Sequence, residues 1–142
     1  MIVPDINLIL YAEIAAFDQH KRARQWWEQS INGERNIGLC APVLFGFIRI
    51  STNRKVFKEP LSTSAALSRA THWLDHPNVR YLTPGSQHVS LAFTLLEQIG
   101  TAANLTTDTQ IAAYALEHGA EVHSNDHDFA RFDGLKFHNP LN

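Results

Sequence analysis

Cysteine, long apolar runs, glycine-rich loops and an excess of either charge are all scarce in this chain of 142 residues. Its one cysteine, Cys40, excludes a disulfide within the chain and is typical of a reducing compartment, which favours the cytoplasm. The longest apolar run, residues 43–48, is far shorter than the roughly 20 residues that cross a bilayer. The start, MIVPDINL, lacks the pattern of a secretory signal. We therefore expect a protein that makes no membrane contact.

The formal net charge of −2 excludes a globally basic protein that coats nucleic acid, and no glycine-rich loop is present to hold the phosphates of a nucleotide. Charge is nevertheless unevenly placed. Eight of the 12 Lys and Arg residues lie between Lys21 and Lys58, whereas seven acids and one base, Arg131, lie between Glu97 and Asp133. A protein that binds RNA and a metal ion would need both regions, the cations for phosphates and the carboxylates for the ion. Charges that merely cover solvent-exposed faces produce the same pattern.

Apolar periodicity and the positions of Pro, Gly and capping residues predict strands that alternate with helices in one domain, residues 1–142. Strands are expected at residues 1–4, 36–40, 78–82, 121–123 and 135–137. Helices are expected at residues 7–16, 19–30, 41–53, 63–74, 89–99 and 107–118, with a short turn or helix at 126–132. Asp18 and either Ser62 or Thr63 are expected to cap their helices. This alternation predicts an α/β fold with a mainly parallel sheet covered on both faces.

Two of these helices carry apolar patterns. Residues 41–53 are almost entirely apolar, so we expect this helix to be buried on most sides. The helix at 89–99, ended by Gly100, is expected to carry an apolar stripe of Val89, Ala92, Phe93, Leu96 and Ile99.

Four aspartates stand where strands end or helices begin. Asp5 follows the first strand, Asp126 and Asp128 follow the fourth, and Asp108 opens a helix on the side of its apolar residues. Ligands collect at the carboxyl ends of parallel strands, so we expect these side chains to meet. Crowded carboxylates raise one another's pKa unless a cation lies among them, and oxygen ligands favour Mg²⁺ or Mn²⁺ over zinc. Taken singly, each of Asp5, Asp108 and Asp126 is also explained as a helix-capping or helix-opening residue.

Three motifs in order resemble the PIN domain, and within it the VapC ribonuclease toxins of toxin–antitoxin pairs. They are Asp5-x-Asn7 after the first strand, the helix opening Thr107-Asp108-x-x-Ile111-Ala112-Ala113, and Ser124-x-Asp126-x-Asp128-Phe129. The segments PVLFGFIRISTN and EHGAEVHSNDHDFARFDGLKFHNPL are similar to one subgroup of these toxins. The resemblance extends from the first strand to Leu141.

The resemblance implies a three-layer α/β/α sandwich and a Mg²⁺-dependent endoribonuclease that cleaves structured RNA, often tRNA or rRNA, and so inhibits translation. It also implies a homodimer held inactive by a small VapB-type antitoxin. Carried over by residue, Asp5 and Asp108 match the most dependable metal ligands, Asp126 and Asp128 match the late acidic pair, and Ser124 matches a hydroxyl that orders the site. One of the late acids would take the proton from the attacking water.

The sequence departs from the family pattern at one position. Most such domains place a glutamate on the helix after the second strand, three residues before an arginine; here Arg49 is that arginine and Gly46 stands at the glutamate position. Gly46, Arg49, Ile50 and Asn53 share a helical stripe, which predicts that the stripe faces the cleft. We expect more metal-bound water and weaker metal affinity, with Glu13 as a candidate substitute ligand. Arg49 either contacts a phosphate or makes a structural ion pair.

Six basic residues are candidate contacts to the RNA backbone, where they would provide affinity rather than sequence choice: Lys21, Arg22, Arg24, Arg54, Lys55 and Lys58. Phe57 either stacks on an unpaired base or covers a hydrophobic edge. Two alternatives stay open. One is a phosphotransferase with Asp5 as its nucleophile; the other is a PIN-like module, weakened by Gly46, that only binds RNA or protein.

Overall fold

The computed structural model describes residues 1–142, which form a five-stranded parallel sheet with strand order β3-β2-β1-β4-β5. The strands are β1 (Ile2–Pro4), β2 (Ile37–Leu39), β3 (Val79–Tyr81), β4 (Glu121–His123) and β5 (Lys136–His138). Because β1 and β4 are neighbours, the residues that follow them, Asp5 and Ser124, leave the sheet side by side. The expected parallel α/β architecture is confirmed.

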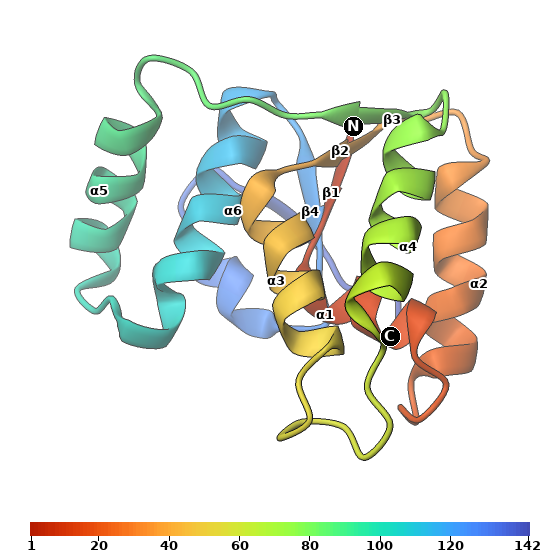
Figure 1. Ribbon diagram of the computed structural model, residues 1–142. Coiled ribbons are helices and arrows are strands. Elements are labelled where there is room, and N and C mark those ends of the chain that lie inside the picture. The colour runs from red at the N-terminus through yellow and green to blue at the C-terminus, as the bar shows by residue number, and fades with distance from the viewer.

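Six α-helices and two short 3₁₀ helices connect the strands. They are α1 (Ile6–Glu13), α2 (His20–Ile31), α3 (Ala41–Ser51), α4 (Thr63–Asp75), α5 (His88–Ile99), η1 (Ala103–Leu105), α6 (Thr106–Glu117) and η2 (His127–Arg131). Figure 1 shows α2 and α4 on one side of the sheet and α5 and α6 on the other. No helix is both long and apolar enough to cross a membrane.

One continuous apolar core of 34 buried residues holds the layers together. The strands β1 and β2 are short apolar runs because both faces of the sheet are covered there. Trp26 and Trp27 are both buried in this core, and Nε1 of Trp26 donates to Nδ1 of His123, which ties α2 to β4. Cys40 is fully buried, and burial raises the pKa of its thiol to about 11.

Some local expectations are confirmed. Ser62 caps α4 by accepting a hydrogen bond from the backbone N–H of Ala65, and proline stands in the first turn of α3. Gly100 and Gly119 follow α5 and α6 with φ of 78° and 60°, the left-handed conformation that favours glycine at a helix end. The sequence therefore places helix ends well wherever glycine or a hydroxyl residue marks them.

Other local expectations are wrong or incomplete. Asp18 does not cap α2, whose N-cap is Gln19 without a side-chain hydrogen bond. The helix α3 is buried or half-buried on most sides as expected, but Phe45 is 68% exposed. In α5, Val89 and Phe93 are exposed, whereas Ala92 and Leu95 are buried in the core and Leu91 and Ile99 pack against it. An apolar pattern indicates a helix but does not distinguish a core face from an unpartnered one, and these three side chains lie on the surface.

Candidate active site

Asp5 follows β1 directly and is the N-cap of α1. Its carboxylate is 3% exposed, and both of its oxygens accept hydrogen bonds. Oδ1 accepts from the backbone N–H of Ile6 at 2.7 Å, and Oδ2 accepts from the hydroxyl of Ser124 at 2.7 Å. Its own N–H donates to the carbonyl oxygen of His123 at 2.9 Å. Asp5 is therefore fixed from β1, α1 and β4 at once.

A chain of hydrogen bonds continues from Asp5 through the segment after β4. The Ser124 hydroxyl, which donates to Asp5, accepts from the N–H of Asp126 at 2.9 Å. Oδ1 of Asp126 in turn accepts from the N–H of Asp128 at 2.9 Å, because Asp126 caps η2. Asp126 is therefore a helix cap, as its alternative explanation predicted, and this cap holds its side chain beside Asp128.

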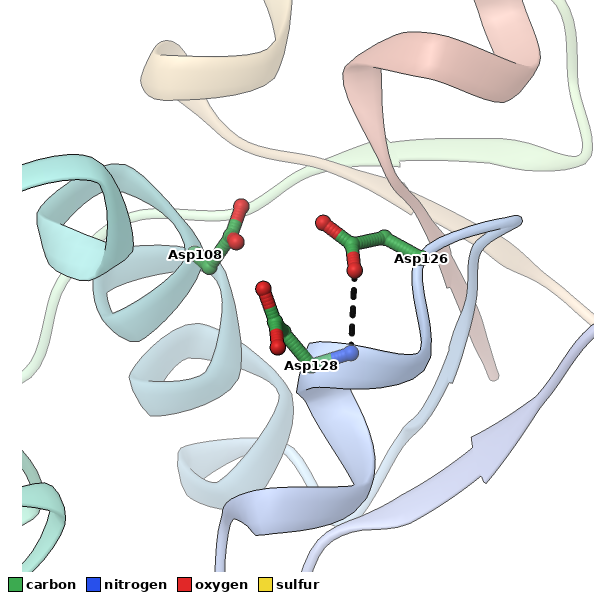
Figure 2. A group of neighbouring side chains, drawn as sticks. All are labelled: Asp108, Asp126 and Asp128. Carbon is green, nitrogen blue, oxygen red and sulfur yellow. Dashed lines mark hydrogen bonds between the residues drawn. The ribbon is translucent and has the colours of Figure 1, made fainter.

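Asp108 comes from a different part of the chain, the first turn of α6, and meets this segment. One carboxylate oxygen from each of Asp108, Asp126 and Asp128 lies within 4.8 Å of the others, and Figure 2 shows the three side chains pointing toward a common space. Asp5 is not part of this three-oxygen group, but it is joined to Asp126 through Ser124. The expected meeting of four acids is therefore observed as a group of three with a buried fourth carboxylate beside it.

Burial and mutual repulsion oppose the charges at this site. Burial raises the pKa of Asp5 to about 6, with the charge of Asp126 adding to the rise and the hydrogen bonds from Ser124 and Ile6 reducing it. The pKa of Asp108 rises to about 7, first because of burial and then because of the charges on Asp5, Asp126 and Asp128. No basic side chain forms an ion pair with Asp5, Asp108 or Asp126. A cation from outside the chain would therefore favour the charged form of the site.

The donor set fits a hard divalent cation. All the ligands that these residues offer are carboxylate oxygens, and Mg²⁺ and Mn²⁺ prefer such oxygens together with water. The three-oxygen group is half-buried, so a cation there would be partly shielded from solvent. The position of the acids at the carboxyl edge of the sheet agrees with the usual place of ligand sites in parallel α/β folds.

Gly46 on α3 contacts Ile6 and also borders the hollow that Arg49 and Thr107 line. A Cβ at residue 46 would lie 2.4 Å from Cδ1 and 3.0 Å from Cγ1 of Ile6, so no side chain fits there without movement of α1 or of Ile6. Glu13 does not replace a ligand, because its carboxylate forms ion pairs with Arg24 and Arg69. The only charged residue of α3 is Arg49, so this helix provides no acid to the site.

Arg49 is exposed and forms neither an ion pair nor a hydrogen bond, so the structural ion pair considered for it is absent. It lines a hollow of about 430 Å³ together with Gly46, Thr107 and Gln110. Thr107, which directly precedes Asp108, lines the same hollow, so the hollow adjoins the first turn of α6. Asn53 does not share the stripe as expected, because α3 ends at Ser51; its Oδ1 accepts from the N–H of Lys55 in the following turn.

The six basic candidates divide into two sets. Arg22 donates to the carbonyl oxygen of Leu141 at 2.6 Å, and Arg24 pairs with Glu13 and Glu28, so these two are engaged within the chain. The others are exposed and have no acidic partner: Lys21 on α2 and Arg54, Lys55 and Lys58 in the loop between α3 and α4. Figure 1 shows this loop extending from the end of α3.

Two further residues are placed by the structure. Phe57 packs edge-to-face on Phe17 with ring centroids 5.5 Å apart, so it covers a hydrophobic edge. Asn7, one residue beyond Ile6 in the first turn of α1, is half-buried and makes no side-chain hydrogen bond to the four acids. Sequence reasoning missed Ile6. Its signal in the sequence was its position directly after Asp5, and its contact with Gly46 is seen only in the structure.

Comparison with known proteins agrees with this geometry. The PIN domain family model matches residues 2–135. Ribonuclease VapC33 of Mycobacterium tuberculosis is 52% identical over 141 residues, 99% of each chain, and ribonuclease VapC37 of the same species is 33% identical over 140 residues, 99% of this chain and 97% of that one. The chain belongs to the PIN domain family, within the VapC ribonucleases.

Solved structures show the same fold at low identity. The crystal structure of M. tuberculosis VapC20, described as a Sarcin-Ricin loop cleaving toxin, has a TM-score of 0.72 at 17% identity and covers 96% of this chain and 99% of that one. VapBC-1 from nontypeable Haemophilus influenzae gives 0.69 at 17% identity and covers 100% of both chains. The three-layer PIN-like fold is thereby confirmed.

The site also argues against a phosphotransferase that uses Asp5 as its nucleophile. A nucleophilic carboxylate needs an oxygen that can reach the phosphorus atom of a substrate. Asp5 is 3% exposed and both of its oxygens accept short hydrogen bonds from Ile6 and Ser124. We therefore set this alternative aside.

Proposed function

We propose that this chain is a Mg²⁺-dependent endoribonuclease, the toxin of a VapBC-type pair, which cleaves structured RNA such as tRNA or rRNA and thereby inhibits translation. The observation that carries the proposal is the group formed by Asp108, Asp126 and Asp128 with Asp5 buried beside it. Mn²⁺ is an alternative ion because it takes the same oxygen ligands. A Sarcin-Ricin loop cleaving relative with the same fold supports rRNA as a substrate class.

Asp5, Asp108, Asp126 and Asp128 would hold the cation, which when bound supplies an activated water and neutralises charge on the phosphate. The chain contributes a fixed arrangement of these carboxylates. Asp5 is held by two short hydrogen bonds, and Asp126 and Asp128 are ordered by the turn that Asp126 caps. Ser124 fixes the position of Asp5 relative to Asp126, because its hydroxyl donates to the Asp5 carboxylate and accepts from the N–H of Asp126.

Asp128 is the best-placed proton acceptor for the attacking water. Its side chain is 48% exposed, and its one ionic contact is the distant one with Arg131, at 3.9 Å. Asp126 has one oxygen occupied by the N–H of Asp128 and is less free to accept a proton. A carboxylate that is open to solvent and close to the other acids can receive the proton and release it to water.

Arg49 and the basic loop would bind the RNA backbone. Arg49 is unpaired and shares a hollow with Thr107, the residue before Asp108, and its planar guanidinium can donate two hydrogen bonds to one phosphate. Arg54, Lys55 and Lys58 extend the positive surface along the α3–α4 loop, with Lys21 as a further contact. These residues would position the RNA and leave the choice of sequence to other contacts.

The proposal includes two protein partners, a second copy of the chain and a VapB-type antitoxin. Phe45, Val89 and Phe93 are exposed and line one apolar hollow between α3 and α5, a surface of the kind that binds protein. This surface supports the homodimer. The antitoxin is supported by the likeness to a solved VapBC structure.

The test is incubation of the purified chain with total RNA in Mg²⁺ or in EDTA, followed by mapping of new 5′ ends. We expect discrete cuts in Mg²⁺ that disappear in EDTA and in Asp5→Asn or Asp108→Asn. RNA binding without cutting by the wild-type chain would instead favour the binding module that lost activity at Gly46. Normal cutting by a folded double variant would overturn the proposed site.

A further inference from the structure

The contact between Gly46 and Ile6 lies one residue from the most buried acid of the site. Ile6 is 7% exposed and is the first residue of α1, which packs against α3. A Cβ at residue 46 would lie 2.4, 3.0 and 3.6 Å from Cδ1, Cγ1 and Cγ2 of Ile6. Gly46 thus leaves room for the whole outer part of the isoleucine side chain.

The same Ile6 holds Asp5 through its backbone. Its N–H donates to Oδ1 of Asp5 at 2.7 Å, and this hydrogen bond lowers the pKa of Asp5 against the effect of burial. The side chain of Ile6 therefore fixes where α1 begins relative to α3, and its N–H fixes the carboxylate. A displacement of Ile6 is passed directly to Asp5.

We propose that Gly46 is a positioning residue for the active site, which sets the orientation of Asp5 by letting Ile6 seat against α3. The inference rests on the proposed role of Asp5 as a metal ligand. It gives the departure from the family pattern at position 46 a role: α3 contributes the space that Ile6 needs, and the cation is held by acids from β1, α6 and the segment after β4.

The geometry says how the effect would be transmitted. An alanine at residue 46 meets Cδ1 of Ile6 at 2.4 Å, a distance that real contacts do not show, whereas Cγ1 at 3.0 Å needs only a small adjustment. Rotation about χ2 would press Cδ1 into the packed core, because Ile6 is 7% exposed. Rotation about χ1 is restricted, because isoleucine in a helix strongly prefers one rotamer. The start of α1 must then move away from α3, and the Ile6 N–H moves with it.

The experiment compares Gly46→Ala, Ile6→Val and the double variant with the wild-type chain, and uses Gly85→Ala as the control for adding a methyl group to a glycine. Ile6→Val removes Cδ1, the atom at 2.4 Å, and keeps the N–H. A methyl group at Gly85 meets the end of the flexible Glu117 side chain at 3.1 Å, far along the chain from the acids. Mn²⁺ affinity is measured without RNA by calorimetry, and the amide proton shift of Ile6 by NMR.

We expect Gly46→Ala to weaken Mn²⁺ binding about 10-fold, the size typical of a lost supporting contact, and to move the Ile6 amide proton upfield. The double variant should regain affinity to within about 3-fold of wild type, the Gly85→Ala control should bind normally, and Ile6→Val alone should change little. Wild-type affinity and an unchanged amide shift in Gly46→Ala would overturn the inference. A double variant that loses as much Mn²⁺ affinity as Gly46→Ala alone would also overturn it.

The two failures can be told apart. A wild-type chain that binds no Mn²⁺ overturns the proposed metal site, while the Ile6 amide shift still decides whether Gly46 positions Asp5. If Gly46→Ala does not fold, a folded double variant with near-normal Mn²⁺ affinity supports the inference, because only the removal of Cδ1 separates the two. A double variant that is folded but binds Mn²⁺ poorly would overturn it.

Discussion

The hydroxyl of Ser124 donates a 2.7 Å hydrogen bond to Oδ2 of Asp5, from a position 119 residues further along the chain. This bond lowers the pKa of Asp5, whereas burial raises it to a net value of about 6. The same hydroxyl accepts from the N–H of Asp126. Ser124 therefore helps to keep the buried carboxylate charged near neutral pH and holds the late acids beside it.

Ser124→Ala should raise the pKa of Asp5 further and free the Asp126 N–H, so that metal binding weakens and requires higher pH. We expect about 10-fold weaker Mn²⁺ affinity at pH 7 and an upward shift in the pH at which binding is half-maximal, measured by calorimetry across pH 5.5–8.5. Ser68→Ala, on the exposed face of α4, is the matched control. An unchanged pH profile in Ser124→Ala would refute this role.

The raised pKa values of Asp5 and Asp108, about 6 and 7 against 3.8 for an ordinary aspartate, also predict how stability depends on pH. Between the ordinary pKa and the raised pKa of each group, the folded chain binds more protons at Asp5 and Asp108 than the unfolded chain does. Their contribution to the free energy of unfolding is therefore complete below about pH 4 and is lost as pH rises through 6 and 7. Added Mg²⁺ should restore stability at pH 8.

Asp108→Asn isolates this effect from that of His123, whose pKa is lowered by burial and which therefore favours unfolding as pH falls. Urea unfolding in EDTA at several pH values should show a smaller loss of stability between pH 6 and 8 in the variant, and a variant more stable than wild type at pH 8. The variant should gain little from Mg²⁺. Parallel curves for the two proteins would mean that Asp108 titrates normally.

Arg54→Gln and Lys58→Gln should each weaken RNA binding without altering Mn²⁺ affinity, because these side chains lie in the α3–α4 loop and have no acidic partner. Each removed phosphate contact should lower the slope of log affinity against log salt by about 0.7 to 0.9. The RNA affinity of each variant, measured over a range of salt concentrations in the inactive Asp108→Asn background so that the RNA stays intact, gives this slope. Lys136→Gln, an exposed change on β5, is the control, and an equal loss there would point to a general charge effect.

Phe93→Ser should shift the chain toward the monomer if the hollow shared by Phe45, Val89 and Phe93 is the dimer surface. Because Phe93 is 66% exposed, the change should leave the unfolding temperature nearly unaltered. Light scattering coupled to size-exclusion chromatography gives the mass. Val56→Ser, 52% exposed in the loop after α3, is the comparison, and an unaltered mass for Phe93→Ser would place the partner elsewhere.

Much of the fold could be predicted because local signals marked its elements. The strand at β4 was predicted at its observed bounds, and the positions of Ser62, Gly100 and Gly119 fixed helix ends through hydrogen bonding and positive φ. Asp18 failed as a cap because a turn through Gln19 starts α2 instead. The apolar stripe of α5 did not show which of its residues are exposed, because exposure depends on what packs on a helix, which its own periodicity does not contain.

The site was predicted in part for a similar reason. Asp5, Asp108 and the acids after β4 were identified by their places at strand ends and a helix start, and topology brings them together. The stripe expected to face the cleft was predicted in part: Gly46 and Arg49 line the hollow that Thr107 also lines, but α3 ends before Asn53, and Ile6 fills the space at Gly46. Likewise, only the tertiary structure shows that Arg22 and Arg24 are engaged within the chain.

Asp5 and Ser124 stand at the ends of β1 and β4, inner strands of the sheet, and the N–H of Asp5 bonds to the carbonyl oxygen of His123 across them. Fraying of the edge strands β3 and β5 leaves this hydrogen bond between β1 and β4 intact. Exchange of the Asp5 amide with solvent deuterium should consequently require unfolding of the whole domain, so the centre of the site should be as durable as the fold itself.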